Sequence, residues 1–213
     1  MTRSMTRSAP PNHSTRPAPV RRYGPAAGEP PLWADPRRWG SLIGLAGGLV
    51  FIVSSSPAFG PVVWIAGWVA GVALVAAALT AHYLRPVPLG PLTPPSPAAL
   101  AIYGGCVIGE LTAINLGSRA LTAAGHDELR PALIAAVVGL HFLPFAWAFS
   151  ERMFYWLGGL VATLGAVGLV AGLFGTAHAA DAAAAAAGLV MLVIITLYAR
   201  GRFAPRPTSG TTT

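Results

Sequence analysis

Two ionisable residues stand in the middle of apolar stretches of this chain, and their types could support proton chemistry. Glu110 lies in "ALAIYGGCVIGELTAINLGSRAL" and His141 lies in "VVGLHFLPFAWAF". A carboxylate and an imidazole that touch can share or exchange a proton near neutral pH. A charged group alone in such surroundings costs about 2.5–3.5 kcal/mol on insertion scales, so each of these residues needs a polar partner.

The positions of these two residues predict that they partner each other. Glu110 is about twelve residues into a predicted helix at Ala98–Leu121, and His141 is about ten into one at Pro131–Phe149. The connection is short, so the helices should run antiparallel as a hairpin. At ~1.5 Å rise per residue the two side chains then lie within roughly one turn in depth. Asn115 should lie one turn further along.

Pro144 follows His141 within the same helix. A proline inside a helix removes one backbone hydrogen bond and frees the carbonyl of Leu140. In an apolar medium that carbonyl must be satisfied internally, so we expect the kink to face protein or a water pocket. Two interpretations of Glu110, Asn115, His141 and Pro144 stay open. They form either a buried polar contact that fixes helix register or a site that handles a proton or ligand.

The medium around these residues follows from composition. Of 213 residues, 54% are hydrophobic and only 10% are charged, whereas about a quarter of a soluble domain is charged. Apolar runs near 20 residues recur, which is typical of transmembrane helices. The predicted fold is an all-α, polytopic membrane helix bundle. Its six spans are Trp39–Ser54, Pro61–Leu84, Ala98–Leu121, Pro131–Phe149, Met153–Gly175 and Asp181–Ala199.

The arginines predict the orientation and the domain limits. With an even number of spans, twelve of the fourteen arginines fall on one side, and only Arg119 and Arg130 fall on the other. The positive-inside rule therefore favours two cytoplasmic termini. Residues 1–38 form a predicted disordered Arg/Pro-rich arm, residues 39–200 the transmembrane domain and residues 201–213 a disordered tail. All cationic residues are Arg, a bias typical of GC-rich bacteria, so we expect a bacterial inner (cell) membrane.

The basic arm allows two interpretations. Arg21, Arg22, Arg37 and Arg38 form either a solvated orientation signal or an arm that binds anionic lipid at about 1 kcal/mol per residue. The net charge of +7 does not indicate nucleic-acid binding. That function needs a basic face with aromatic or motif support on a soluble fold, and here the arginines lie in tails and short loops.

Small residues four apart predict how the helices associate. Lipid tails are as apolar as leucine, so helices in a membrane need close backbone contact. The segment "DAAAAAAG" suggests that the first half of the last span faces protein. Such faces also predict a homo-oligomer or a partner membrane protein, besides the lipid bilayer itself. The small residues four apart form stripes on the first, second, third and fifth predicted spans. These stripes are Gly40, Gly44 and Gly48; Gly67 and Gly71; Ala101, Gly105, Gly109, Ala113 and Gly117; and Gly168 and Gly172.

Common catalytic motifs are missing from the sequence. It contains no HExxH, no P-loop and no GxSxG. The single cysteine, Cys106, excludes a disulfide framework and a cysteine-based metal site. "HDELR" at 126–130 places His126, Asp127 and Glu128 together, but a solvated loop explains them better than a metal. We therefore expect no enzyme activity, no cofactor and no bound metal.

The stretch "GLHFLPFAWAF", followed by a short charged turn and "FYWLGGL", resembles a family of small uncharacterised bacterial integral membrane proteins. In that family a Gly-Leu-His-Phe-x-Pro core leads to an aromatic pair and a glycine. The likeness covers Val137–Gly159 and departs from the family at "SER", where a more basic turn is expected. The resemblance implies no activity.

Two function classes remain from the sequence. The first is a non-catalytic accessory or assembly component of a membrane, supported by the small-residue faces and the missing catalytic motifs. The alternative is a small-molecule or proton-coupled transporter that uses Glu110 and His141. An intramembrane enzyme would need more reactive groups at one depth than the sequence provides.

Overall fold

The structure, a computed structural model, describes residues 30–89, 92 and 94–203 and contains only helices and connections in these ranges. Six helices are long and apolar enough to cross a membrane. They are α1 (Pro36–Ser55), α2 (Pro61–Leu79), α3 (Pro97–Ala123), α4 (Arg130–Ala148), α5 (Met153–Leu173) and α6 (Ala179–Ala199). Short turns η1 (3₁₀, Ser56–Phe59), η2 (π, Thr80–Leu84) and η3 (3₁₀, Asp127–Leu129) flank them. The expected all-helical class with six long apolar helices is confirmed.

Proline and a capping side chain define where α1 and α3 begin. Asp35 accepts a hydrogen bond from the backbone N–H of Arg37 at 2.9 Å, and Pro36 takes the first helical position. Ser96 and Pro97 repeat this arrangement at α3. A cap satisfies an otherwise orphaned N–H, and proline has none to satisfy. Helix α1 therefore begins three residues before the predicted Trp39, and Arg37 and Arg38 belong to it.

Most of the predicted arm and tail, residues 1–29 and 204–213, lies outside the described residues. Within the described part, residues 36–38 are helical and Arg38 is buried. Our placement of Arg37 and Arg38 in a solvated arm was therefore wrong. The error arose because two adjacent arginines were taken to end the apolar span, although a helix end can bury arginine when acceptors lie nearby.

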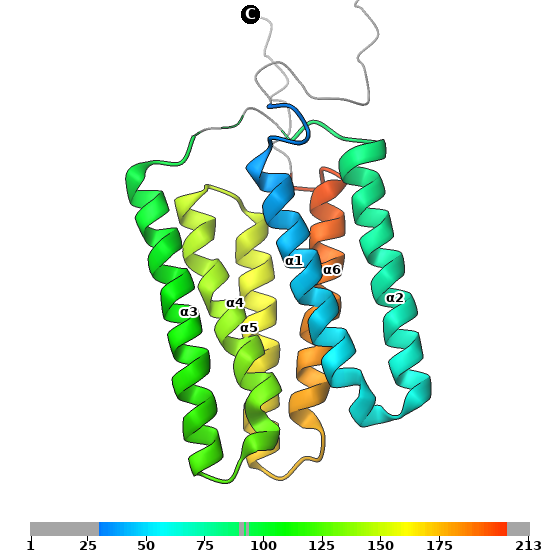
Figure 1. The fold of residues 1–213 in the computed structure, drawn as a ribbon, viewed down its shortest axis with the longest axis vertical. Helices are drawn as coiled ribbons and strands as arrows, with labels where there is room; N and C mark the ends of the chain where they lie inside the picture. Colours follow the sequence, from blue (N-terminus) through cyan, green and yellow to red (C-terminus); the bar gives the residue numbers. More distant parts are fainter. Residues whose placement is uncertain (1–29, 90–91, 93, 204–213) are drawn as a thin grey trace, which may run out of the picture.

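The last helix in the chain lies in the centre of the bundle (Figure 1). Helix α6 packs against α1, α2, α4 and α5, whereas α3 packs mainly against α4. In the most apolar stretch of each helix, 61% of residues are buried in α6, against 11% in α2 and 6% in α3. Ala183, Ala184 and Ala187 in the first half of α6 are buried, as the sequence predicted, whereas Ala182 is exposed. Helices α2 and α3 are therefore the two edges of the bundle.

Glycine allows two pairs of helices to approach at backbone distance. A Cβ added at Gly188 of α6 would lie 2.5 Å from the carbonyl oxygen of Gly48 of α1. A Cβ at Gly139 of α4 would collide with the backbone of Ala162 of α5. Such contacts gain van der Waals energy where no hydrophobic exclusion operates between helices. These glycines explain why α1 packs on α6 and α4 on α5.

The small-residue stripe of α3 differs from this pattern. Ala101, Gly105, Gly109 and Ala113 are exposed, and an added Cβ at Gly105 or Gly109 would meet nothing within 4 Å. Only Gly117 lies against α4. The expectation that the whole stripe packs inside the bundle was wrong. The half-buried positions of α3 include Glu110, and a helix that turns its carboxylate towards a neighbour must turn the adjacent Gly109 away.

Candidate functional site

The structure brings Glu110 and His141 together. Oε1 of Glu110 and Nδ1 of His141 are 3.5 Å apart, and the two side chains are 17% and 12% exposed. The contact lacks hydrogen-bond geometry, and Nδ1 has no other hydrogen-bond partner. A shift of a few tenths of an ångström would bring the two atoms into the range in which one proton is shared. The arrangement can therefore hold a proton between two helices.

Aromatic rings surround the imidazole of His141. The ring centroid of Phe142 lies 4.1 Å from it and that of Phe145 lies 5.2 Å away, edge to face. Tyr103 of α3 stacks on Phe145 at 5.3 Å. These rings pack against α3 and α5 and offer the imidazole no strong acceptor. Glu110 is therefore the polar neighbour on which His141 depends.

Asn115 and Pro144 do not join this pair. Asn115 is exposed and makes no hydrogen bond with any described residue. At 100° per residue it lies about 140° around α3 from Glu110, so the two cannot share one face. Pro144 is exposed, as is Leu140, and α4 continues through it. The structure therefore places the proline on the outer face of α4, away from the expected polar pocket.

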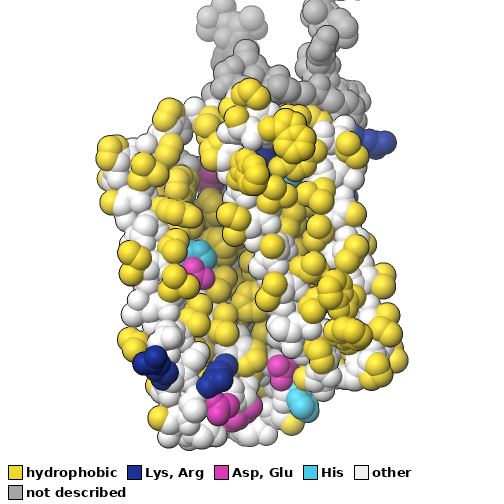
Figure 2. Space-filling view, in the orientation of Figure 1, with side chains coloured by type: hydrophobic (Ala, Val, Ile, Leu, Met, Phe, Trp, Pro, Cys, Tyr) yellow, Lys and Arg dark blue, Asp and Glu magenta, His cyan; other side chains and the backbone are white. Residues whose placement is uncertain are grey.

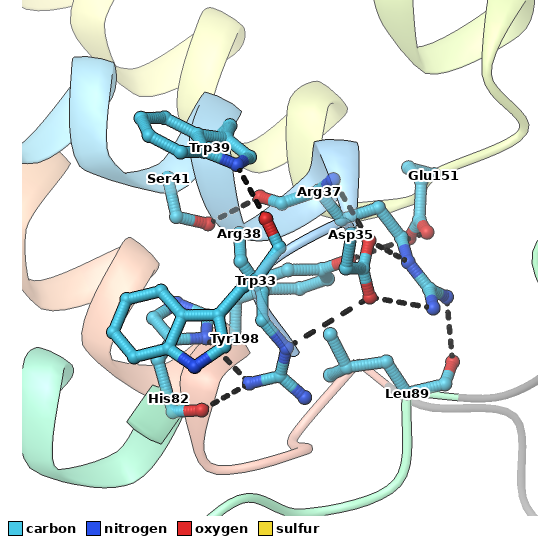
Figure 3. Close-up of polar contacts among 10 residues, drawn as sticks. All are labelled: Trp33, Asp35, Arg37, Arg38, Trp39, Ser41, His82, Leu89, Glu151 and Tyr198. Carbon is cyan, nitrogen blue, oxygen red and sulfur yellow. Dashed lines mark hydrogen bonds and ion pairs between the residues drawn. The ribbon is translucent and has the colours of Figure 1, made fainter. Parts of the chain in front are cut away.

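A second polar cluster lies at one end of the bundle, which we call the basic end. It holds the first residues of α1, α3 and α5 and the last residues of α4 and α6 (Figure 1). We call the cluster the helix-end network; its members are Asp35, Arg37, Arg38, His82, Glu151 and Tyr198 (Figure 3). They come from α1 and its cap, the π turn after α2, the α4–α5 turn and α6.

Asp35 links the two adjacent arginines in this network. Arg37 donates from Nε to Oδ1 at 3.1 Å and from Nη2 to Oδ2 at 3.0 Å. Its Nη1 donates to the carbonyl of Leu89 at 3.3 Å. Arg38 approaches Oδ2 with Nε at 3.8 Å. One carboxylate, 2% exposed, thus compensates two guanidinium groups, and Arg37 ties the α2–α3 connector to α1.

Arg38 in turn holds the end of α2. Its Nη1 lies 3.3 Å from Nδ1 of His82 and also donates to the carbonyl of His82. In an α-helix that carbonyl would accept from the N–H of residue 86, but residue 86 is proline and has none. The guanidinium of Arg38 supplies the missing donor. Arg38 and His82 are 2% and 0% exposed, so this contact belongs to the interior.

Glu151 completes the network from the α4–α5 turn. It accepts a hydrogen bond from the hydroxyl of Tyr198 at 3.4 Å. Burial raises the pKa of Glu151, while Arg37 and the Tyr198 hydroxyl act in the opposite direction. The carboxyl group therefore takes up a proton more readily than a glutamate in water.

Within the described ranges, no three His, Cys, Asp or Glu side chains stand close enough to hold a metal ion. In the loop at 126–130, His126 contacts Glu128 at 3.2 Å and Arg130 contacts Asp127 at 2.7 Å. These exposed residues pair with one another at the end opposite the helix-end network.

Comparison with known proteins adds one match. Residues 120–200 match the model of a family of unknown function, DUF7010. No curated protein and no solved structure matches the chain. The expectation of an uncharacterised family is confirmed, and the stretch 137–159 that carried it lies within the matched residues.

The DUF7010 segment includes the central helix α6 and the closely packed pair α4 and α5. It runs from the end of α3 through α4 and α5 to the end of α6. His141, Glu151 and Tyr198 lie within it, whereas Glu110, Asp35, Arg38 and His82 lie outside. Both polar clusters therefore join the DUF7010 segment to helices that the family match does not cover.

The sequence interpretation missed the helix-end network, although two signals were present. The dipeptide Asp35-Pro36 is typical of a helix start, with the aspartate as cap. A helix beginning there places Arg38 on the same face as Ser41 and Leu45, both buried. Pro86 then marks His82 as a residue whose carbonyl needs a donor from elsewhere. These signals predict a buried Arg38 but do not say which histidine it meets.

Proposed function

We propose that the protein is a multi-pass integral membrane protein that spans a bacterial inner membrane six times with both termini in the cytoplasm. Six apolar helices support this, because leucine, valine, isoleucine and tryptophan side chains remain exposed on α2 and α3. The basic end would face the cytoplasm, since arginine favours that side.

Reporter fusions test this topology. Fusions after Gly90 and Thr213 should report the cytoplasm, and a fusion after Gly125 should report the opposite side. A fusion after Thr213 that reports the outside would contradict the six-span arrangement.

Within that topology we propose a non-catalytic accessory or assembly role, in which α3 contacts another transmembrane helix. The observation that carries this proposal is the outward small-residue face of α3, where Gly105 and Gly109 leave open space beside a helix that is 6% buried. Small residues let a neighbouring helix approach at backbone distance.

Site-specific cross-linking in native membranes tests this role. In a Cys106→Ala background, Gly109→Cys should form disulfide-linked or maleimide-linked adducts, and Gly117→Cys, which faces Leu133 within the bundle, should not. An adduct at twice the mass of the chain identifies a second copy, and another mass identifies a different partner. Equal and negligible yields at both positions would contradict an assembly role for α3.

A transporter remains the second candidate because Glu110 and His141 touch near mid-helix and stay partly exposed. A proton-coupled carrier needs such a group to change protonation on the way across. Proteoliposomes loaded with a pH-sensitive dye test this candidate. Proton flux that is present in the wild type and lost in Glu110→Gln and His141→Gln would support it, and absence of flux in the wild type would exclude proton transport.

A further inference from the structure

Charge is distributed unequally between the two ends of the bundle. The opposite end carries Asp127, Glu128 and Asp181 against Arg119 and Arg130. The basic end carries two carboxylates, those of Asp35 and Glu151, among its described residues. Its arginines are Arg37, Arg38, Arg85, Arg152, Arg200 and Arg202. The basic end therefore has an excess of positive charge, whereas the opposite end has a slight excess of negative charge. Figure 2 shows acidic and basic side chains gathered next to one another at the opposite end.

Both carboxylates of the basic end are already engaged inside the protein. Asp35 binds Arg37 and approaches Arg38, and Glu151 accepts from Tyr198. Four arginines remain exposed, and none of them makes an ion pair with another described residue. They lie after the π turn of α2, in the α4–α5 turn and after α6. These four, which we call the arginine ring, are Arg85, Arg152, Arg200 and Arg202.

We propose that the arginine ring binds the headgroups of anionic phospholipids. This inference rests on the proposed insertion into a membrane and adds a partner to it. The guanidinium group donates two parallel hydrogen bonds to a phosphate, and several basic residues next to a transmembrane helix favour anionic lipid. Of the four arginines in the predicted arm, Arg37 and Arg38 are engaged in the helix-end network, and Arg21 and Arg22 lie outside the described residues.

Neighbouring aromatic side chains favour a lipid over a soluble anion or an acidic protein. Trp39, Trp147, Tyr155 and Trp156 are 55%, 67%, 56% and 59% exposed. They lie within the first or last turn of their helices at the basic end. Tryptophan and tyrosine prefer the level of the lipid headgroups. The arginine ring thus lies at the level at which phosphates of a bilayer would meet it.

The arrangement also predicts how the lipid is recognised. The four arginines come from three separate segments at the end of the bundle and do not line a single cavity. Recognition should therefore depend on headgroup charge and on salt, and little on headgroup shape. Phosphatidylglycerol and phosphatidylserine should bind alike.

Tryptophan quenching by brominated lipids tests the proposal on the full chain in bilayers. A Trp64→Phe/Trp68→Phe background removes the tryptophans at the start of α2, at the opposite end. Bilayers of phosphatidylcholine with phosphatidylglycerol are prepared with bromine on one lipid or the other. The association constant of phosphatidylglycerol should exceed that of phosphatidylcholine by about fivefold or more, the factor expected from a single arginine. In 0.5 M NaCl the ratio should fall towards one, because salt screens exposed charges.

The variant Arg85→Gln/Arg152→Gln/Arg200→Gln/Arg202→Gln should lower the ratio to about one. Arg119→Gln, at the opposite end, should leave it unchanged. If the fourfold variant does not fold, the salt series on the wild type decides. A wild-type ratio of one, a ratio insensitive to salt, or a folded fourfold variant that keeps the preference would overturn the proposal.

Alkaline carbonate extraction of the same membranes separates this outcome from failure of the proposed function. A chain that stays in the pellet but shows no preference for phosphatidylglycerol overturns the lipid proposal alone. A chain released into the supernatant overturns membrane insertion, and the lipid proposal with it.

Discussion

The two polar clusters of the bundle handle buried charge differently. In the helix-end network Asp35, Arg38 and His82 are 2%, 2% and 0% exposed. Glu110 and His141 retain 17% and 12% exposure although they lie nearer the middle of their helices. The difference follows from the number of partners. The helix-end network provides its charged groups with a bidentate ion pair and two backbone carbonyls. Glu110 and His141 have only one long contact with each other. The more deeply buried cluster thus has more partners, although Nε of Arg38 and Nε2 of His82 have no hydrogen-bond partner.

The clusters also differ in the helices that they connect. The network joins α1, the end of α2, the α4–α5 turn and α6, so its loss would loosen several contacts at once. The pair joins only α4 and α3, and α3 lies at the edge of the bundle. We therefore expect a structural role for the network and leave a proton-handling role to the pair. Four measurements test this distinction.

Arg38→Met should have the largest effect. It keeps most of the side-chain stem but leaves the carbonyl of His82 without its donor and removes one of the two guanidinium groups next to Asp35. Breaking a buried ion pair from one side costs about 3–5 kcal/mol. Unfolding in detergent should show a loss of this size, and Arg85→Met, at an exposed site, should change stability by less than about 0.5 kcal/mol. Equal effects of the two variants would contradict the structural role of the network.

A double-mutant cycle on Glu110→Gln and His141→Gln should give a smaller effect. Each single change leaves the other group without its partner, so the double variant should lose less than the sum of the singles. A coupling of about 0.5–1.7 kcal/mol is expected, in the range measured between polar groups in membranes. Strict additivity would show that the two side chains do not interact in the folded protein.

Glu151 should make stability depend on pH. Because burial raises its pKa, the folded protein keeps this proton to a higher pH than the unfolded chain does. Stability should therefore fall as pH rises from the usual glutamate value of ~4.3 through the raised pKa. Glu151→Gln should flatten this part of the profile of Tm against pH. At pH values above the raised pKa, this variant should have a higher Tm than the wild type. Glu128→Gln, on the exposed loop, serves as the control. Hydrogen bonds from the backbone and from His126 lower the pKa of Glu128, which gives the opposite pH dependence, so this variant should keep the fall in stability with rising pH.

The smallest effect is expected at Gly109 of α3, the helix that carries Glu110. Gly109→Leu should leave the stability of the isolated protein within about 0.5 kcal/mol of the wild type, because the added side chain meets open space. Gly48→Leu, against the backbone of Gly188, should cost about 1–3 kcal/mol or more. A large loss of stability in Gly109→Leu would mean that Gly109 contacts a neighbour that does not belong to the bundle.

The helices were largely predictable because length and apolarity define them. The predicted second segment, Pro61–Leu84, coincides with α2 and its π turn. The predicted fifth begins at Met153 like α5. The error at α1 arose from treating Arg37 and Arg38 as a boundary when the Asp35-Pro36 cap marked it. Capping chemistry, where present, is thus a better guide to a helix start than charge.

The rotation of each helix about its own axis, which decides the face that points into the bundle, was less predictable from the sequence. Glu110 was correctly expected to meet His141, because a mid-helix carboxylate needs a partner. The outward orientation of Gly105 and Gly109 did not follow from the stripe, since small residues suit either a close neighbour or none. The position of Asn115 away from the pair follows from simple helix geometry. The choice of His82 as the partner of Arg38 depends on contacts between residues far apart in the chain. The hydrophobic periodicity of a helix carries no information about such contacts.

The central position of α6 has a consequence for the order of events during synthesis. Among the six described helices α6 is synthesised after the other five, yet α1, α2, α4 and α5 all pack against it. At ~5–20 residues per second, α1 is complete roughly 7–30 s before α6 is. During that interval Gly48 and the other α1 residues that later contact Gly188 have no partner from this chain. A nascent chain that stops before Ala179 therefore lacks the helix that covers this face of α1, and completion of α6 supplies it.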